Sequence, residues 1–178
     1  GLSAIIAPEL EFYLCEQNLD PDLPLKTPVG KSGRRETGSR VFGIDAVNEF
    51  DALTDDIYDY CEMMNIGVDT LVHESGPSQI EINLNHGDPL ALADQAFMFK
   101  RAVRQVALKH GIHATFMAKP YQGQPGSSMH IHQNLISMDS GKNLFCDKEG
   151  ANSAQFLNYI GGLQTYLPDA MLLFAPYV

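Results

Sequence analysis

The chain has 178 residues, a length that suits one domain, and 44% of them are apolar, as in an ordinary globular protein. Twelve Lys and Arg residues against 22 Asp and Glu residues give a formal net charge of −10, which argues against nucleic acid or an anionic membrane as the main partner. We see no signal peptide, no membrane-spanning apolar run and no CxxC pair among three distant cysteines. A cytoplasmic location without a zinc site or disulfide framework is therefore expected.

Apolar and acidic residues alternate along residues 3–15, which predicts a strand that turns Glu9 and Glu11 to the same side. Residues 17–43 are rich in Pro, Gly and charge and predict a long loop. Its basic residues could meet phosphate or a neighbouring subunit, but a solvated mobile loop is the favoured interpretation. These basic residues are Lys31, Arg34, Arg35 and Arg40.

A helix is predicted over residues 45–65, because apolar residues recur there at three- and four-residue steps. Gly67 lies just past its expected end. Residues 66–84 then predict a hairpin, with residues 75–78 (Ser-Gly-Pro-Ser) as the turn.

The expected register of this hairpin places acidic side chains close together. Glu74 pairs with Gln79, and Val72 pairs with Glu81, so Glu74, Gln79 and Glu81 share one face. The two carboxylates are then diagonal neighbours, roughly 7–8 Å apart between Cα atoms. Like charges at that separation are unfavourable unless a cation lies between them.

The next helix has clear boundaries at both ends. Asp88 is its expected N-cap, a proline follows at the first position, and Gly111 ends it after residue 109. Residues 112–119 (IHATFMAK) are predicted to form a buried strand.

The remaining elements alternate between short strands and one helix. Strands are expected over residues 128–137 and 143–146. A helix is expected over residues 153–167, ended by Pro168, with another helical turn over residues 169–175. Strands with interspersed helices predict an α+β fold, in which helices cover one face of a largely antiparallel, curved sheet.

Two imidazoles complete the candidate site. His130 and His132 alternate with apolar residues on one strand face, directly after the turn GQPGSS, whose backbone N–H groups suit an anion. Carboxylates with an occasional imidazole are typical ligands of Mg²⁺ or Mn²⁺. The candidate site residues are therefore Glu9, Glu11, Glu74, Glu81, His130 and His132.

Three segments, APELEFYL, HESGPSQIEIN and ATFMAKPYQGQPGSSMHIHQNL, together resemble the catalytic domain of the glutamine synthetase superfamily. The resemblance covers the whole chain, and the motifs have the family's order and spacing. The amino-acid sequences of these segments and of the loop LDPDLPLKTPVGKSGRRETG are most similar to those of the γ-glutamylputrescine (γ-glutamylpolyamine) synthetases of bacteria. The implied fold is the glutamine synthetase/guanido kinase-like catalytic domain.

The resemblance implies an ATP-dependent ligase that phosphorylates the γ-carboxylate of glutamate and then lets an amine attack to form a γ-glutamyl amide. Divalent cations would neutralise the phosphoryl charge and orient an in-line transfer. It implies no catalytic residue in this chain beyond metal ligands. The matching positions are Glu11, Glu74 and Glu81 for a first metal, Glu9 and His130 for a second metal, Gly126 for glutamate, and His132 for the nucleotide.

Departures from the family pattern bear on the nucleophile. Pro125 stands where ammonia-using glutamine synthetases usually carry Asn, and Asn134 stands where Ser is common. The segment from Glu74 to Glu81 is one residue shorter than in the ammonia-using type. These differences favour a primary amine of the putrescine type over ammonia.

The family's N-terminal β-grasp-like domain and its later catalytic segments have no counterpart in residues 1–178, so we expect an incomplete catalytic domain without turnover of its own. The resemblance implies a ring-shaped homo-oligomer for the longer parent. The alternatives are an ammonia-using glutamine synthetase, a non-catalytic structural homologue, and, with less support, a metal-binding module unrelated to nucleotides.

Overall fold

The computed structural model describes residues 1–174, and these fall into two compact units. One unit comprises Ile6–His132, and the other comprises Gly1–Ile5 with the described residues that follow His132. The elements in chain order are β1 (Leu2–Glu16), α1 (Ile44–Asn48), α2 (Asp51–Met63), β2 (Val68–His73), β3 (Gln79–Leu84), α3 (Pro89–Lys109), β4 (Ile112–Thr115), β5 (Met129–Ser137) and α4 (Ala154–Phe174).

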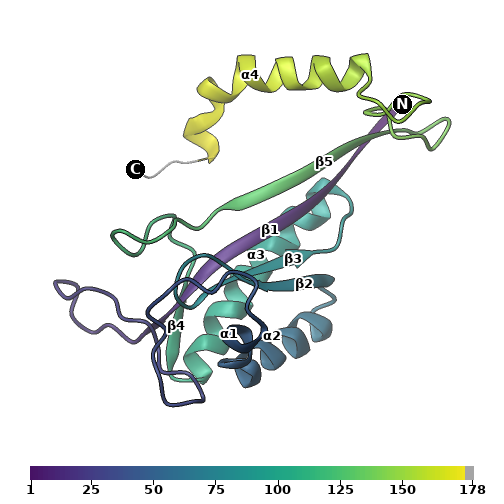
Figure 1. Ribbon diagram of the computed structural model, residues 1–178. Helices are drawn as coiled ribbons and strands as arrows, with labels where there is room; N and C mark the ends of the chain where they lie inside the picture. The colour runs from purple at the N-terminus through teal and green to yellow at the C-terminus, as the bar shows by residue number, and fades with distance from the viewer. Residues whose placement is uncertain (175–178) are drawn as a thin grey trace. The chain divides into compact units, whose positions relative to one another are not determined.

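The larger unit is built on a sheet whose strands follow the order β2-β3-β1-β4, with β5 also paired to β1 (Figure 1). The pairs β2–β3, β3–β1 and β1–β4 are all antiparallel. The predicted α+β class with a largely antiparallel sheet is therefore confirmed. The strand expected over residues 112–119 is shorter than predicted and ends at Thr115.

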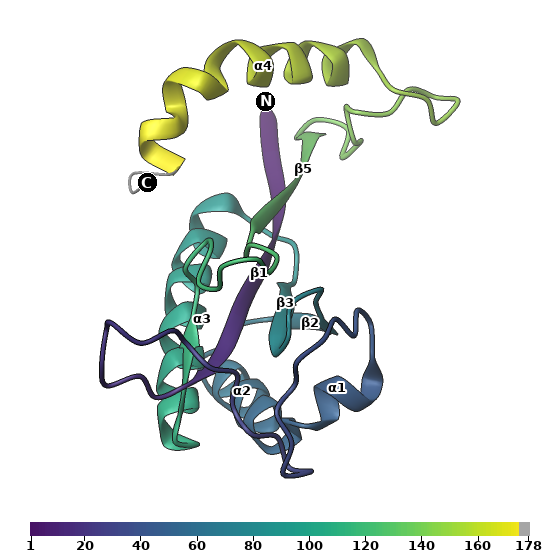
Figure 2. The same cartoon turned by 60° about the vertical axis from the view of Figure 1, so that its left-hand side comes forward.

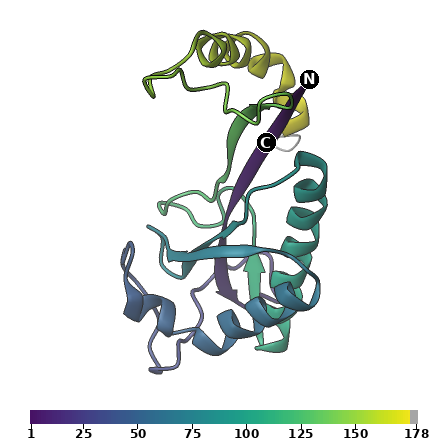
Figure 3. The ribbon, with the colours of Figure 1, turned by 90° about the vertical axis from the view of Figure 1, so that its right-hand side faces the viewer.

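Helices α2 and α3 cover one face of this sheet (Figure 3). Leu10 and Phe12 of β1 are buried among the apolar residues of both helices, and the Phe12 ring lies 5.1 Å from that of Phe116, centroid to centroid. Because successive strand residues alternate between faces, Glu9 and Glu11 lie on the opposite face. The functional candidates thus occupy the side of the sheet away from the helices.

The hairpin and the third helix follow the predictions closely. Val72 is the partner of Glu81, and the backbone N–H of Glu74 donates to the carbonyl of Gln79 at 2.8 Å. The carboxylate of Asp88 caps α3 by accepting from the N–H groups of Leu90 and Ala91, both at 3.0 Å. Turn chemistry and capping, which act over a few residues, were enough to predict both features.

The helix predicted over residues 45–65 is wrong as a single element, because it is divided into α1 and α2 (Figure 2). The carbonyl of Glu49 accepts a hydrogen bond from the backbone N–H of Lys31 at 3.0 Å. The N–H of Leu53 donates to the carbonyl of Phe50 at 3.0 Å, three residues back, whereas the α-helical acceptor lies four residues back. Helix α2 ends at Met63, and it is Asn65, with φ of 55°, rather than Gly67 that takes the left-handed conformation after it.

Two predictions in the smaller unit are also wrong. Residues 143–146 form only isolated bridges, Ile136 with Asn143 and Cys146 with Asn152, because turns flank them closely on both sides. Helix α4 continues through Pro168 and bends in its last part (Figure 1), since proline removes one helical hydrogen bond without preventing those on either side. Residue 175, the last of the predicted final turn, lies outside the described residues.

The long loop before α1 is attached to the body of the larger unit. Lys31 pairs with Asp51 at 2.5 Å, Arg35 pairs with Glu16, and Val29 bridges to Arg35. Over residues 1–174, none of the helices combines the length and the apolar character that a bilayer crossing requires.

Candidate metal centre

The sheet register brings carboxylates from two strands into direct opposition. Glu11 of β1 is the cross-strand partner of Glu81 of β3, and Glu9 is the partner of Asn83. Directly opposite residues on one face have closely spaced Cβ atoms, so like charges there destabilise the pair. Glu11 and Glu81 are nevertheless buried, with 7% and 9% of their surface exposed.

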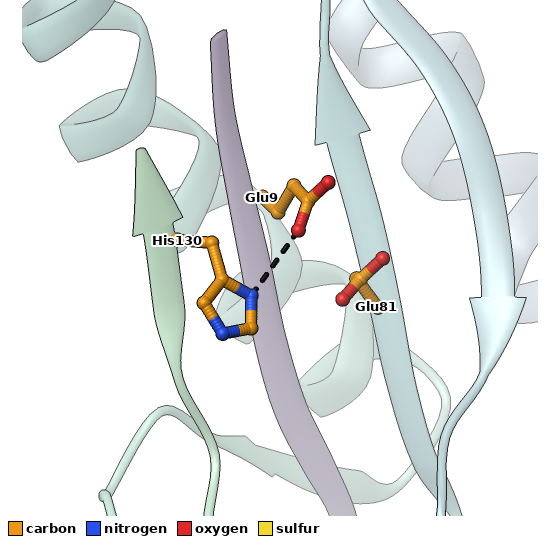
Figure 4. A group of neighbouring side chains, drawn as sticks. All are labelled: Glu9, Glu81 and His130. Carbon is orange, nitrogen blue, oxygen red and sulfur yellow. Dashed lines mark hydrogen bonds and ion pairs between the residues drawn. The ribbon is translucent and has the colours of Figure 1, made fainter. Parts of the chain in front are cut away.

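Glu9, Glu81 and His130 form the centre of the site, each from a different strand (Figure 4). One ligand atom from each of the three lies within 4.8 Å of the others, a spacing that one cation can bridge. His130 Nδ1 lies 3.1 Å from Glu9 Oε2, and His132 Nε2 lies 2.6 Å from Glu9 Oε1. The two carboxylates and the imidazole fit the oxygen-rich ligand set that Mg²⁺ and Mn²⁺ prefer.

Glu11 lies beside this group with one oxygen directed to it. Its Oε1 is 3.8 Å from His130 Nδ1, whereas its Oε2 accepts from Gln79 Nε2 at 3.0 Å and from the N–H of Ser128 at 3.1 Å. The predicted anion-binding turn therefore does donate a backbone N–H to a carboxylate, and that carboxylate is Glu11.

Glu74 is the predicted ligand that stands apart from the three-residue group. Its Oε2 accepts from the N–H of Ser75 at 3.2 Å. The negative charge of Glu74 nevertheless acts on Glu81. The pKa of the Glu81 carboxyl is raised above the ordinary 4.5, first by burial and then by the charges of Glu9 and Glu74. A bound cation would offset this repulsion.

Asn83 adds a polar group next to the carboxylates. A hydrogen bond with its side chain opposes the rise in the pKa of Glu81. Its Oδ1 is buried, and no hydrogen-bond partner for that atom occurs within residues 1–174. A buried acceptor without a partner is uncommon in folded proteins and agrees with a site that suits a cation.

The turn GQPGSS, which contains Gly126, is held next to the carboxylates by two hydrogen bonds. The hydroxyl of Tyr13 donates to the carbonyl of Pro125 at 2.8 Å, and Gln79 Nε2 donates to the carbonyl of Gly126 at 2.9 Å. Burial, and then the charges of Glu11 and Glu74, raise the pKa of Tyr13 to about 12, so its hydroxyl remains a donor at neutral pH. A Cβ at Gly126 would come within 2.8 Å of the carbonyl oxygen of Ala118, which explains why glycine occupies this position.

Sequence reasoning missed a hydrogen-bond network next to Glu74, formed by His73, Glu36 and Ser78. His73 is 1% exposed, and its Nε2 lies 2.9 Å from Glu36 Oε2, while its Nδ1 lies 2.8 Å from the carbonyl of Glu74. Glu36 Oε2 also accepts from the N–H of Ser78 at 2.6 Å. Glu36 belongs to the long loop, where no periodic pattern marked it as buried.

Comparison with known proteins gives one family over the whole chain. The family described as "Glutamine synthetase, catalytic domain" matches residues 1–178. Gamma-glutamylputrescine synthetase PuuA of Escherichia coli (strain K12) is 41% identical over 182 aligned residues, which cover 100% of this chain and 38% of that protein. The glutamine synthetase of Pyrococcus abyssi (strain GE5 / Orsay) is 34% identical over 163 residues, covering 92% of this chain and 34% of that protein.

A solved structure has the same fold. The structure titled "Apo GmaS without ligand" superimposes with a TM-score of 0.81 and 26% identity, and the match covers 99% of this chain and 40% of that chain. The chain thus spans well under half the length of the relatives that it matches.

Proposed function

The chain belongs to the glutamine synthetase catalytic-domain family, and from this premise we propose that it is part of an ATP-dependent ligase that joins glutamate to an amine. The observation that carries the proposal is the convergence of Glu9, Glu81 and His130 on one point of the sheet. The chain covers 38% and 40% of two matched relatives, which supports residues 1–178 being part of the catalytic domain of a longer protein. By resemblance, we propose that this part is central and that the longer protein is cytoplasmic.

The proposed ligand set divides between two cations. Glu11, Glu74 and Glu81 hold the first, on the glutamate side, and Glu9 and His130 supply two ligands of the second, on the nucleotide side. When bound, Mg²⁺ or Mn²⁺ supplies positive charge that neutralises the phosphate oxygens of ATP and the γ-carboxylate of glutamate. Without such charge, an acidic site would repel both substrates.

The side chains of this region bind and orient the substrates. Gly126 lies on a loop that Tyr13 and Gln79 hold in place, and it is proposed to lie beside bound glutamate. His132, whose Nε2 contacts Glu9, is proposed to approach the nucleotide phosphates. Holding both substrates in register converts a reaction between separate molecules into an effectively intramolecular one. The products of the two steps are ADP, phosphate and a γ-glutamyl amide.

A primary amine such as putrescine is the proposed nucleophile. Support comes from the match to a gamma-glutamylputrescine synthetase over the whole of this chain. Pro125 adds support, because it lacks the side-chain amide that the family resemblance leads us to expect there in ammonia-using enzymes. Ammonia is the second candidate, since 34% identity to a glutamine synthetase covers 92% of the chain. A ring-shaped homo-oligomer is proposed for the longer protein by resemblance.

The substrate proposal is tested with the protein expressed at the full length of its reading frame. We expect ADP release that requires glutamate, Mg²⁺ and putrescine, with γ-glutamylputrescine detected by mass spectrometry. We expect kcat/KM for ammonium to be at least about tenfold lower than kcat/KM for putrescine. A tenfold difference corresponds to about 1.4 kcal/mol of transition-state binding. Equal or greater efficiency with ammonium would favour the glutamine synthetase alternative. Tight Mn²⁺ binding without any ADP release would favour the metal-binding module, and absence of both would favour the non-catalytic homologue.

A further inference from the structure

Gln79 is almost completely enclosed, with 1% of its surface exposed, at the start of β3. Its Oε1 accepts from the N–H of Gly76 at 2.9 Å. Its Nε2 donates to Glu11 Oε2 at 3.0 Å and to the carbonyl of Gly126 at 2.9 Å, and Ser127 Oγ lies 3.4 Å away. Both N–H groups of the amide therefore have close acceptors.

These partners fix the orientation of the amide. If the oxygen and nitrogen were exchanged, Oε1 would face the Glu11 carboxylate and the Gly126 carbonyl, two acceptors, and the NH₂ group would face a backbone N–H. These three contacts would become repulsive, and the amide of Gln79 would lose its hydrogen bonds to all three groups. The observed orientation is thus the one that the surroundings permit.

The same amide joins two parts of the site that are more than a hundred residues apart in sequence. Glu11 is a proposed ligand of the first cation, and Gly126 lies in the loop proposed to border glutamate. Gln79 and the N–H of Ser128 both donate to Glu11 Oε2. The other oxygen of Glu11, Oε1, is therefore the one that faces His130 Nδ1, at 3.8 Å. Residues that orient metal ligands in this way are as important to a site as the ligands themselves.

We propose that Gln79 is a positioning residue that couples the carboxylate of Glu11 to the Gly126 loop, so that a divalent cation on Glu11 orders the loop that borders glutamate. This inference rests on the proposed function, because it takes Glu11 as a cation ligand. Coupling between two binding sites is reciprocal: if the cation raises the affinity for glutamate, glutamate raises the affinity for the cation by the same factor.

The test is hydrogen exchange, followed by mass spectrometry, on the protein expressed at the full length of its reading frame, with and without saturating Mg²⁺. In the unmodified protein, Mg²⁺ is expected to slow exchange in peptides that cover residues 118–128 by about 5- to 150-fold, the range typical of coupled sites. Gln79→Met has similar length but no donor. It is expected to bind Mg²⁺ about 10- to 100-fold more weakly. At saturation it should show less than about a twofold change in loop exchange, below the range of coupled sites.

The matched control is Gln105→Met, at an exposed position on α3, which should leave both the affinity and the loop protection unchanged. Should circular dichroism show that Gln79→Met does not fold, Gln79→Asn takes its place, since its amide is one methylene too short to reach both acceptors.

The outcomes separate the two proposals. Loop protection by Mg²⁺ that persists in the Gln79 variant, or that never occurs in the unmodified protein although Mg²⁺ binds, would overturn the role of Gln79 alone. An unmodified protein that binds no divalent cation would overturn both the role of Gln79 and the proposed function.

Discussion

Replacing Glu81 with glutamine is expected to remove much of the stabilisation by Mn²⁺ while making the metal-free protein more stable at pH 7. Glu81 is 9% exposed, and burial and the charges of Glu9 and Glu74 raise its pKa. A carboxyl group whose pKa is raised by folding favours the native state when protonated. That contribution is present below the ordinary value of 4.5 and is lost as the pH rises through the raised pKa. At pH 7 the acidic side chain of Glu81 therefore destabilises the metal-free fold, and the glutamine amide does not.

Melting temperatures in EDTA and in excess Mn²⁺ measure both effects. A ligand at 100 times its dissociation constant stabilises by about 2.7 kcal/mol, which raises the melting temperature of a chain this long by about 5–10 °C. We expect this rise for the unmodified protein and for the control Glu62→Gln, whose side chain is exposed on α2. The rise should be clearly smaller for Glu81→Gln, which loses a ligand of the first cation. The advantage of Glu81→Gln in EDTA should vanish below pH 4.5. An undiminished Mn²⁺ effect in Glu81→Gln would show that Glu81 is not a ligand.

Removing Glu36, the partner of the buried His73, is expected to destabilise the protein severely. Glu36→Ala leaves His73, 1% exposed, without its partner at Nε2 and leaves the N–H of Ser78 without an acceptor. Each buried polar group left without a hydrogen-bond partner costs about 1–3 kcal/mol, so the two groups together cost about 2–6 kcal/mol. Urea denaturation should show this loss as a lower midpoint with an unchanged slope.

A double replacement distinguishes the pair from a general effect of the loop. Glu36→Leu/His73→Phe removes both polar groups and fills their volume, so it should recover a large part of the stability lost in Glu36→Leu. The exposed control Asp55→Ala on α2 should change stability by less than about 0.5 kcal/mol. A loss below about 1 kcal/mol in Glu36→Ala would mean that the loop is not anchored through this pair.

Local patterns predicted the elements that are determined locally. The register that pairs Val72 with Glu81 followed from alternation and a four-residue turn, and the start of α3 followed from Asp88. The division between α1 and α2 could not be predicted, because it depends on the N–H of Lys31, which lies in an irregular loop. Pro168 was given too much weight, since the loss of one hydrogen bond does not end a helix whose other bonds remain.

The site shows the same division between local and long-range information. The sequence placed Glu9 with Glu11, Glu74 with Glu81, and His130 with His132, each pair within one short segment. Which strands adjoin is a long-range property that residue spacing does not give. Before the fold, only the family resemblance grouped Glu11 with Glu81 and Glu9 with His130, and the fold shows the direct opposition and the contact. Glu36 gave no signal at all, because in the sequence a partly buried acid in a charged loop resembles a solvated one.

The central claim is that carboxylates from β1 and β3 hold one divalent cation, and that Glu9 of β1 and the imidazole of His130 from β5 hold a second one beside it. The most direct test is pulsed electron paramagnetic resonance of Mn²⁺ bound to the protein, which detects nitrogen coordinated to the ion. The account predicts coupling to one imidazole nitrogen in the unmodified protein and its loss in His130→Gln, with Mn²⁺ still retained by the carboxylates. Bound Mn²⁺ without nitrogen coupling, or coupling that survives in His130→Gln, would contradict it.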